Sequence, residues 1–178
     1  ILMSEHVLTL GGGCFWCLDA VFREVPGISS CTSGYAGGEL PEPDYDSVCG
    51  GRTGHAEVVR LVFDPARVSQ EQLLDIFFTI HDPTTLNRQG NDVGTQYRSV
   101  IFCRDPAQRA AIEDYLARLG ASGAFTRPIV TEIADDATFW PAEDYHQDYF
   151  RRNPGQGYCQ FVVAPKVAKY RQKWPAAR

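Results

Sequence analysis

The sequence predicts an α/β or α+β fold in which helices pack as a second layer on a central mixed β-sheet. Strand-like alternation and helical periodicity follow one another in the order β-α-β, β-α, β-α-β, which is typical of two-layer sandwiches. No internal repeat or linker-like run divides the 178 residues, so we expect residues 1–178 to form a single domain. A doubly wound sheet is the less favoured alternative, because helices do not regularly separate the strands.

The first predicted unit is a strand, a glycine turn and a helix. Residues 6–10, HVLTL, alternate apolar and polar side chains and stop at three glycines. From Cys14 onward the apolar residues follow helical spacing until a Pro-Gly pair ends the run. The next strand is ISSCTSGYA, residues 28–36, and the Gly- and Pro-rich residues 37–54 predict a long loop.

The residue patterns in the middle of the chain predict a strand, a helix and a second long loop. Residues 55–63, HAEVVRLVF, alternate as a strand does. Residues 69–80 carry an apolar stripe at helical spacing, and Ser69 is a plausible N-cap. Residues 81–96 are expected to form a loop, and loops of this length inside a compact domain are usually functional.

The last part of the chain adds two strands and two helices. The patterns predict a strand over 97–103, a helix over 106–120 that starts with Pro and ends at Gly, a strand over 127–134, a short helix over 140–152, and a mostly irregular segment from Asn153 onward.

The composition and charge limit the partners. The formal net charge is −5 and the pI is about 5.3, which removes the electrostatic driving force for binding phosphate backbones, so nucleic acid is not expected. No stretch reaches the roughly 20 apolar residues that span a membrane, and the start of the chain does not look like a secretion signal. We expect a cytoplasmic monomer, and we interpret the residues before Met3 as an addition to the natural chain.

The six cysteines indicate metal or redox chemistry in a cytoplasmic protein. In GGGCFWC, Cys14 opens a helix, where free backbone amides and the helix dipole favour a thiolate, so Cys14 is the predicted nucleophile. Cys14 and Cys17 form C-x-x-C, which fits either a redox pair or one nucleophile beside a packing cysteine. Zinc is weakly supported, because the other cysteines form no second pair at such spacing.

Two aromatic residues follow the predicted nucleophile. Phe15 and Trp16 could wall the sulfur with apolar surface and exclude water, or both rings could simply pack in the core. Neighbours on a helix point about 100° apart, so we expect at least one ring to stay near a surface cleft.

A glutamate lies on the apolar face of a predicted strand. In GHAEVVRLVF, Glu57 shares its face with Val59, Leu61 and Phe63. Desolvation there would raise its pKa and keep a proton available, which predicts a general acid. The alternative is a glutamate at the sheet edge that reaches solvent.

Several motifs in this order resemble the peptide methionine sulfoxide reductases of the A type, over a span from about Leu8 to Cys159. They are Cys14-Phe15-Trp16, Gly34-Tyr35-Ala36-Gly37-Gly38, Gly54-His55-Ala56-Glu57, His81-Asp82-Pro83-Thr84, Gln89-Gly90-Asn91-Asp92 and Gly94-Thr95-Gln96-Tyr97-Arg98-Ser99. The resemblance implies thiol-dependent reduction of methionine S-sulfoxide, free or in proteins, as protein repair under oxidative stress. It also implies an α/β sandwich with a ferredoxin-like plait at its centre.

The resemblance also implies roles for single residues. Cys14 would attack the sulfoxide sulfur and become a sulfenic acid, and Glu57 would protonate the sulfoxide oxygen. The other implied roles are an S-methyl pocket from Phe15 and Trp16, hydrogen bonds to the sulfoxide oxygen from Tyr45 and Tyr97, and a contact from Asp92 to the polar part of the substrate.

The resemblance further implies a second thiol and a reductant. Cys159, on the predicted irregular C-terminal segment, matches the usual resolving position, and thioredoxin would reduce the resulting disulfide. Cys17 stands where many members carry glycine, so it is either a second recycling thiol or a buried helix residue. No organic or metal cofactor is implied. Packing or loop positions are expected for Cys31, Cys49 and Cys103.

Two other classes of function remain open for a chain with these cysteines. A general thiol-disulfide oxidoreductase would use Cys14 and Cys17, and a noncatalytic thiol-bearing binding module would show no turnover.

His55 and His81 are expected to orient their neighbours, and His146 is expected on a helix surface or behind the site.

Overall fold

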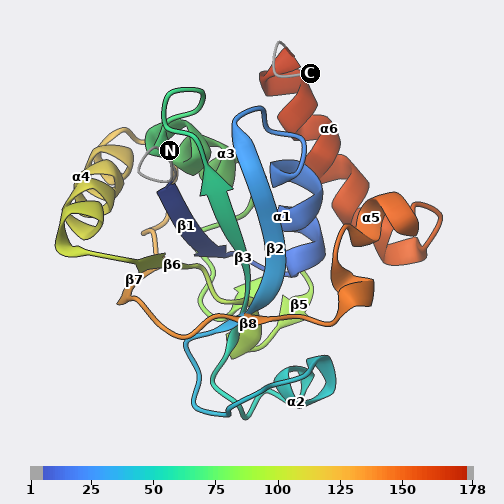
Figure 1. Cartoon of the computed structure of the whole chain (residues 1–178). Coiled ribbons are helices and arrows are strands. Elements are labelled where there is room, and N and C mark those ends of the chain that lie inside the picture. Colours follow the sequence, from blue (N-terminus) through green and yellow to red (C-terminus); the bar gives the residue numbers. More distant parts are fainter. Residues whose placement is uncertain (1–5, 176–178) are drawn as a thin grey trace.

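A six-stranded sheet forms the centre of the computed structural model, which describes residues 6–175 (Figure 1). The interpretation of the residues before Met3 lies outside the described residues. The strand order is β7-β6-β1-β3-β2-β8, and every pair is antiparallel except β6 and β7, so a mixed sheet is confirmed. The strands are β1 (His6–Gly11), β2 (Ile28–Ala36), β3 (Ala56–Phe63), β6 (Val100–Cys103), β7 (Glu132–Asp135) and β8 (Trp140–Pro141); β4 (Arg88–Gln89) and β5 (Asp92–Val93) form a separate ribbon.

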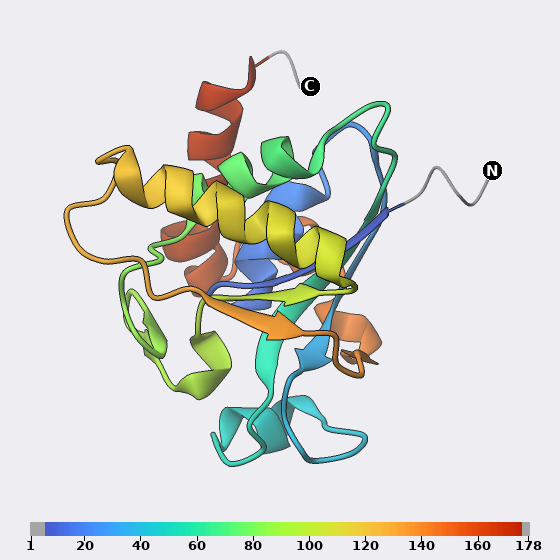
Figure 2. The ribbon, with the colours of Figure 1, turned by 90° about the vertical axis from the view of Figure 1, so that its left-hand side faces the viewer.

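Four helices pack on one face of this sheet as a second layer (Figure 2). Side chains from all four belong to a single buried cluster with the strand residues of that face. The predicted cap of one helix is confirmed, because Ser69 Oγ accepts from Gln72 N at 3.1 Å. The four are α1 (Phe15–Phe22), α3 (Gln70–Ile80), α4 (Pro106–Ala121) and α6 (Ala164–Lys173); α2 (Tyr45–Cys49) and α5 (Tyr149–Arg152) are short.

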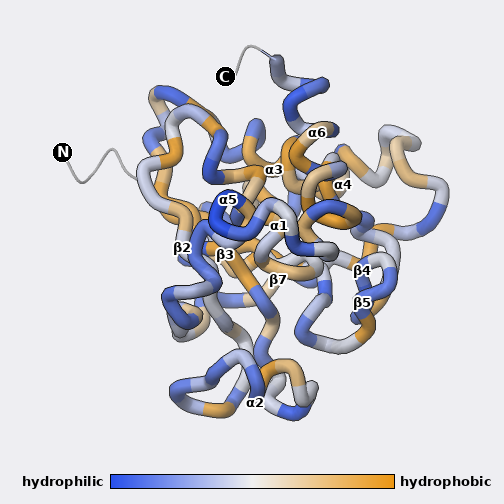
Figure 3. Tube along the Cα trace, turned by 90° about the vertical axis from the view of Figure 1, so that its right-hand side faces the viewer, coloured by the Kyte–Doolittle hydropathy of each residue, from blue (hydrophilic) through white to orange (hydrophobic). Residues whose placement is uncertain are grey.

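The alternation along β3 separates two hydrophobic clusters. Val59, Leu61 and Phe63 face the helices, whereas Val58 belongs to a smaller cluster on the other face with Phe102. In Figure 3 the trace of β3 is mostly hydrophobic, whereas that of α5 is hydrophilic. Glu57, in register with Val59, therefore lies on the helix-covered face, as its position in the sequence predicted.

The irregular C-terminal segment predicted from Asn153 onward is wrong for most of its length. A π-helical turn, η4 (Cys159–Val163), leads directly into α6. Val163, Val167 and Tyr170 are buried at helical spacing on one face. Pro165 does not break this helix, because it directly follows the π-helical turn η4, where the regular α-helical hydrogen bonding is already interrupted.

The helix predicted over 140–152 is also wrong as a continuous element. This stretch contains β8, a 3₁₀ turn η3 (Asp144–His146) and α5. The backbone at Asp148 adopts left-handed angles, with φ of 55°, which interrupts helical hydrogen bonding. The two predicted long loops contain α2, β4, β5 and a 3₁₀ turn η2 (Thr95–Tyr97). None of the helices in the described range is long and apolar enough to cross a membrane.

A buried aspartate on α1 anchors the segment that carries η3 and α5. Asp19 is 1% exposed and accepts from Arg23 Nε at 2.6 Å, Ser33 Oγ at 3.2 Å and Asp148 N at 3.0 Å. It thus joins α1, β2 and the segment before α5.

We expect Asp19→Ala to lower the free energy of unfolding by about 2–3 kcal/mol, because three donors lose a buried acceptor. Urea denaturation measures this. Asp114→Ala is the control, since it removes only an exposed i,i+4 pair with Arg118 and should change the free energy of unfolding much less. Equal midpoints for the two variants would contradict the anchoring role.

Candidate active site

The turn between β1 and α1 places Cys14 at the N-cap of the helix. Gly12 and Gly13 permit this turn because buried side chains crowd it. A Cβ at Gly12 would lie 2.9 Å from the Phe77 ring, and Gly13 has φ of +96° with Gln89 Cγ only 2.7 Å from the place a Cβ would take. The glycines therefore let the nucleophile candidate enter the core at the start of a helix.

The carboxyl of Glu57 reaches this helix start from β3. Its Oε1 accepts from Phe15 N at 3.1 Å, and its Oε2 is buried without a hydrogen-bond partner among residues 6–175. Burial raises the pKa of Glu57 to about 8, although the Phe15 N–H favours the charged form. At neutral pH the carboxyl is mostly protonated.

Cys14 is a thiol in the resting site, and the predicted thiolate is wrong for this state. The Trp16 backbone N–H does lower the pKa of Cys14, as the helix start predicts, but burial and then the adjacent Glu57 carboxyl raise it well above the ordinary value. Cys14 is only 6% exposed, so loss of hydration outweighs the helix effect. The site therefore holds two protonated groups side by side.

Aromatic rings form a wall beside this pair. Phe15 is fully buried and Trp16 is half-buried, so one of the two rings reaches the surface, while the cleft beside it stays a prediction. The Tyr45 ring stacks on Trp16 with centroids 6.4 Å apart, and Tyr149 stacks on Trp16 at 3.8 Å and 4°. The rings of this aromatic wall come from α1, α2 and α5.

Three polar groups predicted from the sequence gather at the same place. Burial, and then the nearby charges, raise the pKa values of Tyr45 and Tyr97; Glu57 and Cys14 contribute to both shifts. Both phenols therefore stay protonated and can donate hydrogen bonds. Asp92 on β5 accepts from Tyr158 OH at 2.6 Å.

Of the two positions expected for His146, on a helix surface or behind the site, the structure confirms the second. It is fully buried in the aromatic wall, where its Nδ1 accepts from Trp16 Nε1 at 2.9 Å. Burial lowers its pKa, so Nε2 carries the proton, and that atom has no partner among the described residues. The helix-surface alternative is wrong because residues 140–152 do not form the continuous helix that it assumed.

Glu143 is a second residue of the wall, and no predicted role pointed to it. Its Oε1 accepts from Tyr35 OH at 2.9 Å and its Oε2 accepts from Tyr45 N at 2.8 Å. It fixes the start of α2 and with it the Tyr45 ring. The aromatic-rich run around Asp144, EDYHQDYF, was the available signal for this part of the wall.

The two candidate resolving thiols occupy different surroundings. Cys17 lies one helical turn after Cys14, close enough that its charge contributes to the raised pKa of Cys14. Cys159 is fully buried at the start of η4, and burial alone raises its pKa. Cys31 and Cys103 are buried and Cys49 is exposed on α2.

His81 is buried behind the glycine turn, where its ring nitrogens contact Phe77 O at 2.5 Å and Ser99 Oγ at 2.8 Å. Burial lowers its pKa to about 4, so it is neutral and orients its neighbours, as expected. Within the described range, no group of three or more His, Cys, Asp or Glu side chains could hold a metal ion.

A buried thiol at a helix start, beside a protonated carboxyl and an aromatic wall, defines a thiol-dependent enzyme class. The family model described as peptide methionine sulfoxide reductase matches residues 6–178. The chain belongs to this family.

Individual relatives agree with the family model. Proteins of Ralstonia nicotianae and Deinococcus radiodurans, both named peptide methionine sulfoxide reductase MsrA, are 57% and 56% identical over 169 residues; these cover 93% and 95% of this chain and 88% and 82% of theirs. Reduced Mxr1 from Saccharomyces cerevisiae has a TM-score of 0.81 at 35% identity, covering 88% of this chain and 90% of its own. Methionine sulfoxide reductase A of Corynebacterium diphtheriae has a TM-score of 0.77 at 38% identity, covering 89% and 79%.

Proposed function

We propose that the chain reduces methionine S-sulfoxide, free or in proteins, with Cys14 as the nucleophile and Glu57 as the proton donor, in the repair of oxidised proteins. The observation that carries this proposal is the Cys14 thiol beside a carboxyl with a pKa of about 8, held in place by the Phe15 N–H. A carboxyl that keeps its proton at neutral pH can give it to an oxygen that gains negative charge.

The first step transfers one oxygen atom. The Cys14 sulfur attacks the sulfoxide sulfur while Glu57 protonates the sulfoxide oxygen. That oxygen then leaves the substrate for Cys14, which becomes a sulfenic acid, and methionine is released as a thioether. The thiol proton of Cys14 restores Glu57, so one thiol and one sulfoxide give one sulfenic acid and one thioether.

The substrate fits the arrangement of the wall and the polar groups. Phe15 and Trp16 offer apolar surface for the S-methyl group. Tyr45 and Tyr97 offer phenol donors to the sulfoxide oxygen, and such bonds are stronger in a dry site than in water. Asp92 offers a carboxylate to the polar part of the substrate.

A second thiol then closes a disulfide, which thioredoxin reduces. Cys159 remains the predicted resolving thiol from the family resemblance, and from a buried π-helical turn it would need η4 to move. Cys17 is the other candidate, and it already lies one turn from Cys14. Mxr1 of Saccharomyces cerevisiae has been solved in complex with Trx2, which supports a thioredoxin as the reductant.

The amount of methionine released without added reductant tests the reaction. It also shows whether thiols beyond the first disulfide take part. We expect the reduced chain to release one methionine per chain from methionine S-sulfoxide, or two if a further thiol relays the disulfide. Chromatography measures methionine and mass spectrometry maps the disulfide. Cys159→Ser should still release one.

Loss of that one equivalent in Cys159→Ser, with Cys14 intact, would refute Cys14 as the nucleophile. Reduction of insulin-like disulfides without any methionine release would instead indicate a general thiol-disulfide oxidoreductase.

The finer structural expectations are also proposals. The order β6-β1-β3-β2, with α1 between β1 and β2 and α3 between β3 and β6, supports a ferredoxin-like plait at the centre of the sheet. We further propose one domain over residues 1–178 that acts as a cytoplasmic monomer.

A further inference from the structure

The side chain of Gln89, on β4, packs against the turn that carries Cys14. Gly13 comes directly before Cys14, and the space where a Gly13 side chain would begin is taken by Gln89: its Cγ, Cβ and Cδ lie 2.7, 3.0 and 3.9 Å from the place of a Cβ. Gln89 is 9% exposed, and in the β4-β5 ribbon it pairs with Asp92, another group of the site. One side chain therefore joins the ribbon to the backbone before the nucleophile.

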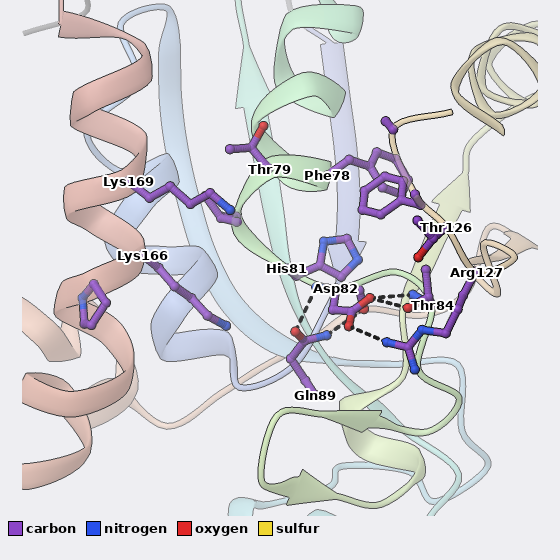
Figure 4. A pocket seen from close by; sticks show the side chains of 14 residues that line it. Phe78, Thr79, His81, Asp82, Thr84, Gln89, Thr126, Arg127, Lys166 and Lys169 are labelled. Carbon is purple, nitrogen blue, oxygen red and sulfur yellow. Dashed lines mark hydrogen bonds and ion pairs between the residues drawn. The ribbon is translucent and has the colours of Figure 1, made fainter. Parts of the chain in front are cut away.

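The amide of Gln89 is held by the backbone of Asp82 (Figure 4). Asp82 N donates to Gln89 Oε1 at 2.8 Å, and Gln89 Nε2 donates to Asp82 O at 2.9 Å. Asp82 is fixed in turn, because its Oδ1 accepts from Thr84 N at 2.9 Å and from Thr84 Oγ1 at 2.5 Å, and its Oδ2 pairs with Arg127 at 3.5 Å. The two bonds to Asp82 use both polar atoms of the Gln89 amide and so fix its orientation.

Packing alone does not keep Gln89 in this position. Gln89 lines a pocket of about 540 Å³ between the end of α3, residues 124–127 and the start of α6, so its side chain borders open space (Figure 4). His81 lines the same pocket and packs against Gly12, the other glycine of the turn. The bonds to Asp82 therefore decide whether Gln89 stays against Gly13 or moves into the pocket.

The position of the turn decides how Cys14 meets Glu57. Phe15 N, two residues after Gly13, donates to Glu57 Oε1 at 3.1 Å. A shift of Gly13 would therefore move both the Cys14 sulfur and the N–H that holds the carboxyl. A misplacement of about 1 Å between reacting groups can cost about 100-fold in rate.

We propose that Gln89 is a positioning residue for the reaction: its amide pair with the Asp82 backbone holds the Gly13–Cys14 turn in place and so aligns the Cys14 sulfur with the Glu57 carboxyl. This inference rests on the proposed reductase function, because the alignment matters only if Cys14 and Glu57 act together on the sulfoxide. Gln89 acts through the backbone of the turn.

The test removes the amide and keeps the bulk of the side chain. Gln89→Met retains an unbranched stem against Gly13 but has no amide to pair with Asp82. The substitution is made in the parent chain and in Glu57→Gln. If Gln89 acts by aligning the acid with the nucleophile, its loss matters only while the acid is present.

The matched control is Gln108→Met on α4. Gln108 is half-buried, and its amide also joins two backbone groups, since its Oε1 accepts from Arg104 N at 2.7 Å and its Nε2 donates to Val7 O at 3.0 Å. Val7 lies near the start of β1, whereas the turn with Cys14 follows the end of that strand. The control therefore removes a similar pair of bonds at a distance from the site.

We expect Gln89→Met to lower kcat for methionine S-sulfoxide about 10- to 100-fold, with KM changed less than about threefold. In the Glu57→Gln background the same substitution should lower the remaining rate less than about threefold. A side chain that only stabilised the fold would slow both backgrounds equally. Gln108→Met should stay within about twofold of the matching chain in both backgrounds. Initial rates with a dithiol reductant give kcat and KM, and near-ultraviolet circular dichroism checks folding.

Three results would overturn the proposal. They are a kcat of Gln89→Met within about threefold of the parent, an equal loss in the two backgrounds, and an equal loss in Gln108→Met. If Gln89→Met does not fold, Gln89→Glu is compared in the same two backgrounds against the same limits, because it keeps the acceptor for Asp82 N and loses the donor when ionised. A parent chain that does not reduce methionine S-sulfoxide would instead refute the proposed function, and this result appears before any substitution at Gln89.

Discussion

Cys14→Ser is expected to reduce methionine release from methionine S-sulfoxide by at least about 10⁴-fold, because a hydroxyl at this position cannot attack the sulfoxide sulfur or hold the oxygen as a sulfenic acid. The change is conservative in size and leaves the helix start intact. Initial rates with thioredoxin or a dithiol as reductant measure the loss.

The matched control is Cys31→Ala, which removes a buried sulfur on β2 whose charged neighbours are Asp19, Arg23 and Asp148. It should retain activity within about twofold when both proteins show the same near-ultraviolet circular dichroism. A Cys14→Ser protein with more than a few per cent of the parent rate would remove Cys14 from the mechanism.

Glu57→Gln is expected to lower kcat by about 10²- to 10⁴-fold, the usual contribution of a positioned general acid. The glutamine amide oxygen can still accept from Phe15 N, so the helix start should stay in place while the proton is lost. KM should change little, because the substrate is held mainly by the aromatic wall and the phenols.

The parent and Glu57→Gln should also differ in their pH dependence. The pKa of Glu57 is raised to about 8, so the acid is present below this pH and the parent rate should fall as pH rises through about 8. The residual rate of Glu57→Gln should lack this limb. An unchanged alkaline limb in the variant would assign it to another group.

The Glu57 carboxyl also makes the free energy of unfolding depend on pH. Because the folded chain keeps a proton on Glu57 that the unfolded chain releases near its ordinary pKa, the free energy of unfolding should decrease as pH rises from about 5 to about 8. Glu57→Gln should flatten this part of the stability curve, as measured by urea denaturation at several pH values.

The local patterns predicted the parts of the fold that depend on sequence neighbours. The glycine turn before Cys14, the face of β3 that carries Glu57 and the Ser69 cap all appear where alternation, helical spacing and capping chemistry indicated them. The C-terminal helix α6 was not predicted, although its apolar spacing is regular and the π-helical turn before it accommodates Pro165.

The parts that were missed depend on tertiary contacts. The Cys14 thiol was expected as a thiolate because the helix start is visible in the sequence, whereas the burial that reverses its charge is not. Glu143, for which no role was predicted, enters the site because residues 140–149 fold back on α1 and α2.

The protonated, buried state of Cys14 has a consequence for the resting protein. Peroxides and alkylating agents react with exposed thiolates, and a sheltered thiol is a poor target for either. We therefore expect the resting protein to resist irreversible oxidation of the Cys14 sulfur. Cys14 should react mainly with molecules that bind at the aromatic wall and make its thiol easier to ionise.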